Sequence, residues 1–286
     1  FLWGASTSAY QVEGAVAEDG KSPSIIDMYE HPEGVADFSV ASDHYHKYKE
    51  DIAMFAKLGL KAYRFSVAWT RILPDGTGNV NEKGIQFYQN VIKECRKYQI
   101  EPVVTMYHFD LPYCLEEKGG WENRETIDAF VNYAKVLFEN YGEDVTYWLT
   151  INEQNTMILH PGAIGLPKGG KLPSQKELYQ QNHHMMLAQA LVMKLFHQMI
   201  PAGKIGPALN LTAMYPASCD PQDAIAAHNW EVLRCWNFAD VPVYGWYHPL
   251  AWEYMQDRKI APEVLGGDRE ILKNAAPDFI AMNYYS

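Results

Sequence analysis

The stretch VTYWLTINEQN, residues 145–155, decides the fold prediction. Its first seven residues are apolar, aromatic or β-branched, which is typical of a buried β-strand. The run then ends in Asn152 and Glu153, followed by two further amides, so that a carboxylate stands among neutral polar groups where the strand stops. A carboxylate in that position suggests a chemical role.

Runs of the same kind recur along the chain and predict six strands. Besides 145–152, they cover residues 1–11, 62–69, 102–109, 204–211 and 278–285. Apolar residues spaced by three and four positions predict helices between them, at 45–55, 85–95 and 127–141, and another over 183–199. Residues 154–183 are expected to form an extended loop. Strands that are apolar on both faces and separated by helices indicate a parallel sheet covered on both sides.

The position of the polar residues favours a closed (β/α)₈ barrel over a doubly wound sheet. No G-x-G-x-x-G turn follows the first strand, as a dinucleotide-binding sheet would require. In a barrel, the ends of several strands converge on one face and build the active site there. Six polar residues lie in or at the end of five different predicted strands: Gln11, Arg64, His108, Asn152, Glu153 and Asn283.

Composition narrows the range of partners and compartments. The 286 residues include 24 basic and 35 acidic side chains, and the net charge of −11 would repel nucleic acid and anionic membranes. No apolar stretch reaches the length of a membrane span, and residues 1–10 do not resemble a signal peptide. The four cysteines show no C-x-x-C spacing, so we expect no zinc or redox site and a cytoplasmic location.

Glu153 is the candidate catalytic residue. A carboxylic acid at the mouth of an apolar barrel is partly removed from water, which disfavours its charged form and keeps a proton available near neutral pH. Cleavage of a glycosidic bond requires such a proton donor, because an alkoxide is a poor leaving group. The alternative is that Glu153 only caps the helix after it.

These motifs together resemble glycoside hydrolase family 1, the retaining β-glucosidases and 6-phospho-β-glucosidases. The resemblance rests on FLWGASTSAYQVEGA, YRFSVAWTRILP, YHFDLP, GGWENRETIDAFVNYA, YWLTINEQN and FIAMNYYS, and it runs along the whole chain. It implies a (β/α)₈ barrel with Glu153 as the general acid/base on the fourth strand. It further implies that the sugar is bound by Gln11, His108, Asn152, Asn283 and Trp121, and that the nucleophile is held by Arg64 and Tyr285.

One departure from the family concerns the nucleophile. The retaining mechanism needs a second carboxylate about 5–5.5 Å from the acid, and the family supplies it in a T-E-N-G motif at the end of the seventh strand. No TENG occurs in residues 1–286. We therefore expect one barrel domain over 1–286 that lacks strands seven and eight and is inactive alone. The family makes the nearest other carboxylates, Asp110 and Glu13, structural.

The expected substrate is a β-glucoside, most closely a 6-phospho-β-D-glucoside. The phospho-specific branch often has a residue other than proline after the acid and an asparagine next, as in NEQN, and an aromatic such as Phe109 in place of the Trp of HWD. An unphosphorylated β-glucosidase or β-galactosidase is the alternative, and a catalytically inactive sugar-binding protein is the alternative from another class. We expect no cofactor and no metal, and the histidines at 44, 46, 183 and 184 are interpreted as structural. A homo-oligomer and the aglycone preference are left open.

Overall fold

The computed structural model describes residues 1–29, 33–160 and 171–285. In this part of the chain, six parallel strands form one sheet in the sequence order β1-β2-β3-β4-β5-β6. The strands are β1 (Gly4–Ser6), β2 (Ala62–Ser66), β3 (Glu101–Tyr107), β4 (Tyr147–Asn152), β5 (Lys204–Leu211) and β6 (Ala281–Tyr284). All six predicted strands are therefore confirmed. Each of β1 and β6 pairs on one side only within the described residues, so the sheet is an open part of a (β/α)₈ barrel.

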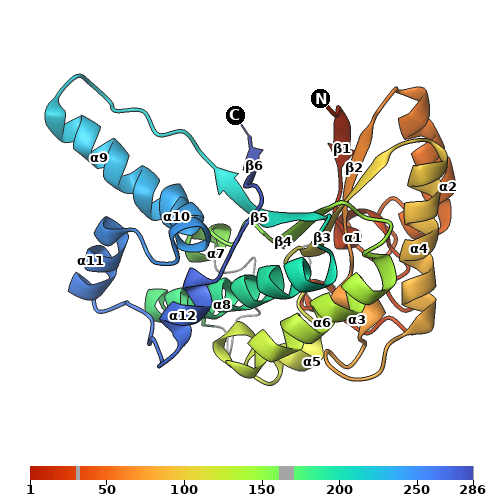
Figure 1. Cartoon of the computed structure of the whole chain (residues 1–286), viewed down its shortest axis with the longest axis horizontal. Helices are drawn as coiled ribbons and strands as arrows, with labels where there is room; N and C mark the ends of the chain where they lie inside the picture. Colours follow the sequence, from red (N-terminus) through yellow and green to blue (C-terminus); the bar gives the residue numbers. More distant parts are fainter. Residues whose placement is uncertain (30–32, 161–170, 286) are drawn as a thin grey trace.

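Helices connect successive strands and cover the outside of the sheet (Figure 1). The longer ones are α2 (His44–Lys57), α4 (Glu82–Lys97), α6 (Glu125–Tyr141), α8 (Gln175–Met199), α9 (Pro221–Glu231), α10 (Asn237–Tyr244), α11 (Pro249–Asp257) and α12 (Asp268–Lys273). Short helical turns are α1 (Ala9–Val12), η1 (Ile26–Met28), α3 (Trp69–Ile72), α5 (Tyr113–Glu116), η2 (Gly120–Glu122) and α7 (Thr156–Leu159), and η4 (Val232–Trp236) is a π-helix. None of the helices in the described ranges is long and apolar enough to cross a membrane.

Aromatic residues of the strands pack against these helices and form the core. Trp148 of β4 contacts Phe138 of α6 and Phe196 of α8, with ring centroids 5.2 and 6.4 Å apart. All three side chains are almost completely buried. Full burial of each ring stabilises the fold by roughly 1.5–3 kcal/mol, which explains why the apolar runs of the sequence become covered strands.

The predicted boundaries differ most from the structure in two regions. The first predicted strand, 1–11, is a strand only at Gly4–Ser6, and Gln11 lies in the helical turn α1. The predicted loop 154–183 contains α7 and the first turns of α8, while residues 161–170 lie outside the described part. Helix α8 begins at Gln175 because Ser174 and Glu177 form a reciprocal capping box, which satisfies the free N–H groups of the first turn.

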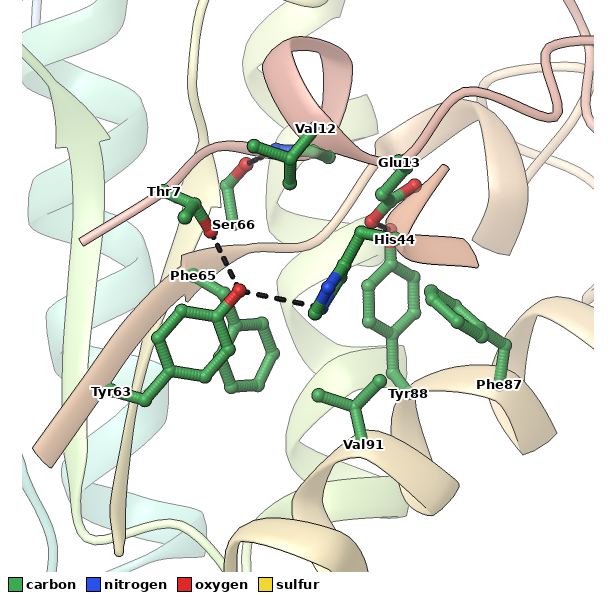
Figure 2. A pocket seen from close by; sticks show the side chains of 11 residues that line it. Thr7, Val12, Glu13, His44, Tyr63, Phe65, Ser66, Phe87, Tyr88 and Val91 are labelled. Carbon is green, nitrogen blue, oxygen red and sulfur yellow. Dashed lines mark hydrogen bonds between the residues drawn. The ribbon is translucent and has the colours of Figure 1, made fainter. Parts of the chain in front are cut away.

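Hydrogen bonds around a small pocket anchor the turn that carries Gln11. Figure 2 shows the hydroxyl of Tyr63 between Thr7, at 2.7 Å, and His44, at 3.4 Å. Ser66 accepts the backbone N–H of Ala9 at 2.7 Å, which fixes the first residue of α1 to β2. The pocket therefore joins the start of the chain to the second strand by buried hydrogen bonds.

A buried ion pair closes the same region. Arg71 Nε donates to Glu13 Oε2 at 2.8 Å, and the hydroxyl of Tyr88 donates to Glu13 Oε1 at 2.6 Å. Arg71 and Glu13 are 2% and 4% exposed, so neither charge has water as an alternative partner. Glu13 is thus a structural residue, as the sequence predicted.

Candidate active site

Five of the six polar residues predicted to converge, all except Gln11, belong to one connected hydrogen-bond network. Arg64 is at its centre: its Nη2 donates to Asn152 Oδ1 at 2.5 Å, and its Nη1 donates to Asn283 Oδ1 at 2.8 Å. Asn283 Nδ2 donates in turn to Glu153 Oε1 at 2.6 Å and to Asn152 Oδ1 at 3.0 Å. Strands β2, β4 and β6 therefore place their polar side chains at one point.

A register shift in β4 turns Asn152 into this network. Trp148 and Thr150 point to the helical side, where the Thr150 hydroxyl donates to Gln189 of α8 at 3.1 Å. Strict alternation along a strand would turn Asn152 to the same side. The pairing of β4 with β5 instead shifts between Leu149 and Asn152, and such an irregularity re-aims the side chains after it.

Glu153 has a left-handed backbone conformation directly after this shift. Its φ angle is +47°, which is uncommon for a residue other than glycine and costs roughly 1–3 kcal/mol. Its N–H still donates to the carbonyl of Ala208 on β5 at 2.7 Å, so that the strand pairing continues to this point. The bend directs the carboxylate to Asn283, which donates to one oxygen, and to the Thr156 hydroxyl, which donates to the other at 3.2 Å. Neutral donors alone thus hold the carboxylate.

His108 is a neutral hydrogen-bonding group in this site. Burial, together with the nearby Arg64 cation, lowers the pKa of His108 to about 3. Its Nε2 lies 3.2 Å from Asn152 Nδ2, a donor, so the ring proton is on Nδ1. That Nδ1 is buried and has no hydrogen-bond partner in the described part of the chain.

The backbone after β3 is strained at the residue that follows His108. Phe109 has a φ angle of +69°, and its ring contacts that of His108 edge to face, with centroids 5.2 Å apart. Asp110 is 2% exposed and its carboxylate accepts the backbone N–H of His108 at 3.3 Å. Burial raises the pKa of Asp110 from 3.8 to about 7. The turn thus combines two rings and a buried carboxyl group.

Arg64 is a half-buried cation with no ion pair among the described residues. Its third donor, Nε, bonds the Thr105 hydroxyl at 2.9 Å, and no carboxylate lies within salt-bridge distance of it among the described residues. Burial lowers the pKa of its guanidinium, and the Glu153 carboxylate and the Tyr285 hydroxyl oppose that shift. Tyr285 is therefore close to Arg64, with 80% of its surface exposed.

Besides Tyr285, two predicted residues lie outside the hydrogen-bond network. Gln11 is exposed, and its side-chain oxygen accepts the Ser8 hydroxyl at 2.6 Å. Trp121 is 2% exposed and packs on Tyr107 and Phe130, with ring centroids 5.8 Å away in each case. The structure thus gives Trp121 a core position, and its predicted contact with a sugar stays a prediction.

Sequence reasoning missed two residues beside the carboxylate. Thr156 contacts Glu153 directly, and its position three residues later at a helix start was the available signal. Tyr10 is close enough to Asp110 and Glu153 for their charges to add to the effect of burial, which together raise the pKa of Tyr10 to about 12. Its hydroxyl therefore stays protonated. In the described ranges, no group of three His, Cys, Asp or Glu side chains is arranged to hold a metal ion.

A half-buried carboxylate held by a neutral amide and a hydroxyl at the end of the fourth strand of a (β/α)₈ barrel is the arrangement of a glycosidase-like site. The sequence profile of Glycosyl hydrolase family 1 matches residues 1–286. The chain belongs to this family.

Relatives that match this chain are named for different substrates. The chain is 40% identical to the aryl-phospho-beta-D-glucosidase BglC of Bacillus subtilis and 39% identical to beta-glucosidase A of Acetivibrio thermocellus, in each case over all of this chain. It covers 61% and 64% of those two proteins. The structure of a beta-glucosidase from Thermotoga maritima in complex with glucoimidazole superimposes with a TM-score of 0.91 at 38% identity, over all of this chain and 65% of that one. The chain thus spans less than two thirds of each of these relatives.

Proposed function

We propose that the protein hydrolyses β-glucosides with retention of configuration and that Glu153 is its general acid/base. The observation that carries this proposal is the Glu153 carboxylate, which accepts hydrogen bonds from Asn283 and Thr156 and forms no ion pair among the described residues. Without a paired cation, the group can gain and lose a proton during one catalytic cycle. In the first step it protonates the leaving oxygen, and in the second it takes a proton from water.

We assign Arg64 and Tyr285 to the nucleophile. The Arg64 guanidinium is half-buried and has no carboxylate partner among the described residues, so an incoming carboxylate would compensate the loss of water around its charge. The family carries its nucleophile in a T-E-N-G motif, which residues 1–286 do not contain, and we expect that carboxylate outside these residues. It would accept the N–H groups of Arg64 on one side, while Tyr285 supplies a hydroxyl. Residues 1–286 would then be part of one catalytic domain.

We assign His108, Asn152 and Asn283 to the hydroxyl groups of the sugar next to the cleaved bond, with exposed Gln11 beside them. All three are neutral, and the buried Nδ1–H of His108 has no partner to satisfy it in the described structure. A sugar hydroxyl that accepts this proton would remove the cost of the unpaired donor, about 1–3 kcal/mol. Binding would therefore favour a polyhydroxylated ligand.

The proposed substrate carries a phosphate on the 6-position. The support is local: the NEQN stretch lacks the proline that simple glucosidases usually have, and Phe109 stands where they have tryptophan. Gln154 is 3% exposed and donates to the Asn182 carbonyl at 2.9 Å, a bond that proline cannot make. Gln154 therefore shapes the turn at Glu153, and we do not assign phosphate binding to its side chain. Phosphorylated sugars occur inside cells, so we also propose a cytoplasmic location.

An unphosphorylated β-glucosidase is the second candidate. The relatives from Acetivibrio thermocellus and Thermotoga maritima are named beta-glucosidases and are about as similar to this chain as the phospho-glucosidase. Overall identity therefore does not separate the two substrates. A dianionic phosphate forms charge-assisted hydrogen bonds that a neutral hydroxyl cannot match, so the difference between the two rates should be large.

The test compares kcat/KM of the intact gene product for 4-nitrophenyl β-glucoside with and without a 6-phosphate. We expect a preference of at least about a hundredfold for the phosphorylated substrate, because phosphate donors left unpaired by plain glucose cost several kcal/mol. A ratio near one would refute the phosphate assignment and support the second candidate. Proton NMR of the first-formed sugar checks retention, and an inverted anomer would refute the double-displacement mechanism.

A further inference from the structure

We propose that Asn155 is a positioning residue that fixes the orientation of Glu153 for proton transfer. This inference rests on the proposed function. Asn155 is 1% exposed, and both polar atoms of its side chain are bonded. Its Nδ2 donates to the Asn210 carbonyl at 2.7 Å and to the Arg234 carbonyl at 2.9 Å, and its Oδ1 accepts the Asn210 N–H at 3.0 Å.

The contacts with Asn210 continue the sheet where the backbone of β4 has left it. The last backbone pairing of β4 with β5 is at Asn152 and Ala208, and the N–H of Glu153 adds one more bond to Ala208. Beyond that point, the side-chain amide of Asn155 receives one bond from Asn210 and returns another, as a paired strand residue would. The turn after Glu153 is thereby tied to β5 two residues further along.

The third contact ties the same amide to an unusual helix. Arg234 is in the π-helix η4, a rare element that is frequently found at functional sites. Its carbonyl accepts Asn155 Nδ2, so β5, η4 and the Glu153 turn share one side chain. Cys235 of η4 also contacts β5, because its thiol lies 3.7 Å from the Asn210 carbonyl.

Glu153 requires such support because its backbone is strained. A φ angle of +47° persists only where the surroundings hold it. The N–H of Glu153 is fixed by Ala208 of β5, but its carbonyl accepts the Thr156 N–H at 2.8 Å, a bond within the turn that would persist if the residues after Glu153 moved away from β5. Asn155 prevents that movement. Its loss would allow the backbone to relax and the carboxylate to swing away from the glycosidic oxygen.

A displaced carboxylate would affect one chemical step more than others. Displacement of a reacting group by about 1 Å can cost on the order of a hundredfold in rate. Proton donation matters most for a poor leaving group such as phenol and little for 4-nitrophenol. A change of folding stability alone would instead reduce the rates for both substrates by the same factor.

The test uses Asn155→Ala and Asn155→Leu in the intact gene product. The second variant keeps the size of the side chain and adds no charge but removes the donors and the acceptor, so it addresses a failure of the first to fold through a cavity. Asn237→Ala is the matched control, because Asn237 is also 1% exposed and its side-chain oxygen accepts the His248 N–H at 3.1 Å, away from the Glu153 turn. Thermal melting of all variants and kcat/KM for phenyl and 4-nitrophenyl β-glucosides, in the phosphorylation state that the wild type prefers, are measured.

We expect both Asn155 variants to lose at least about tenfold more activity on the phenyl glycoside than on the 4-nitrophenyl glycoside, as for an impaired proton donor. Asn237→Ala should lower both rates equally. Equal losses in the Asn155 variants, with an active wild type, would overturn the positioning role and leave the proposed function intact. A wild type that hydrolyses neither glycoside would refute the proposed function and this role with it.

Discussion

Asn283 Nδ2 lies 2.6 Å from Glu153 Oε1, although 130 residues separate the two in the chain. The contact joins β6 to the end of β4, across β5 which lies between them. Such a bond forms only when the sheet is curved enough to bring the ends of non-adjacent strands together, as in a barrel. The geometry of the candidate acid therefore depends on the curvature of the whole sheet.

Replacing Glu153 by glutamine should slow the cleavage of glycosides with poor leaving groups far more than the cleavage of those with good leaving groups. The amide keeps the size of the side chain but cannot donate a proton at neutral pH. We expect kcat/KM for glycosides with poor leaving groups to fall by about 10²–10⁴-fold, the usual contribution of general acid catalysis, while glycosides of acidic phenols retain formation of the glycosyl-enzyme. Steady-state and burst kinetics on both classes measure this. An equal loss on both would argue against the acid role.

Asp110 should make folding stability depend on pH. Its pKa is raised to about 7 by burial, so the folded protein holds this proton more tightly than the unfolded chain does. The contribution of this protonation to the free energy of unfolding is therefore complete below about pH 4. It is lost as the pH rises toward 7, by at most about 1.4 kcal/mol per pH unit.

Asp110→Asn removes this titration and keeps an oxygen for the His108 N–H. We expect the free energy of unfolding of the variant, relative to wild type, to increase between pH 4 and pH 7. Urea unfolding at several pH values measures the difference. A difference that does not change with pH would show that Asp110 is ionised in the folded protein over the whole range.

Glu13→Gln should destabilise the fold through Arg71. Removing one partner of a buried ion pair leaves the other charge without compensation and typically costs about 3–5 kcal/mol. The exposed pair of Lys83 and Asp19, 2.8 Å apart, offers a control, because Asp19→Asn should cost far less than Glu13→Gln when water screens both charges. Urea unfolding of both variants measures the two costs. Similar small losses would mean that water reaches Arg71.

Residues 1–286 produced alone should associate. Strands β1 and β6 are edges in the described sheet, and Trp3 and Tyr284 near these edges are 73% and 56% exposed. Unpaired backbone groups beside apolar side chains favour pairing between molecules. We expect aggregates in sedimentation velocity and no glycosidase activity. A monomer that melts cooperatively would contradict this expectation.

The sequence predicted the sheet well because burial on both faces leaves a strong compositional signal. The runs around Phe65 and Trp148 are rich in aromatic and β-branched residues, and tertiary packing agrees with local preference there. The signal failed at Gln11, where a polar contact between Ala9 and Ser66 of β2 starts a helical turn. Contacts between residues distant in sequence are not visible in a local pattern.

The sequence predicted which residues form the candidate site, but it did not predict the hydrogen bonds and backbone conformations that connect them. Strand ends identified Arg64, Asn152 and Asn283, since parallel strands converge at one face. Nothing local predicted the register shift that re-aims Asn152, or the left-handed conformation of Glu153. The capping box that starts α8 at Ser174 was readable from its S-x-x-E spacing and was overlooked.

At Glu153, the left-handed backbone conformation makes the residue that the proposed activity requires unfavourable for thermal stability. Every L-amino acid with a side chain inherits the unfavourable φ angle of +47°, and glycine alone adopts it freely. A glycine at 153 would relieve about 1 kcal/mol or more of strain and would abolish the proposed proton donor. Selection for thermal tolerance alone would therefore erode this residue, and its persistence would have to be maintained by the chemistry.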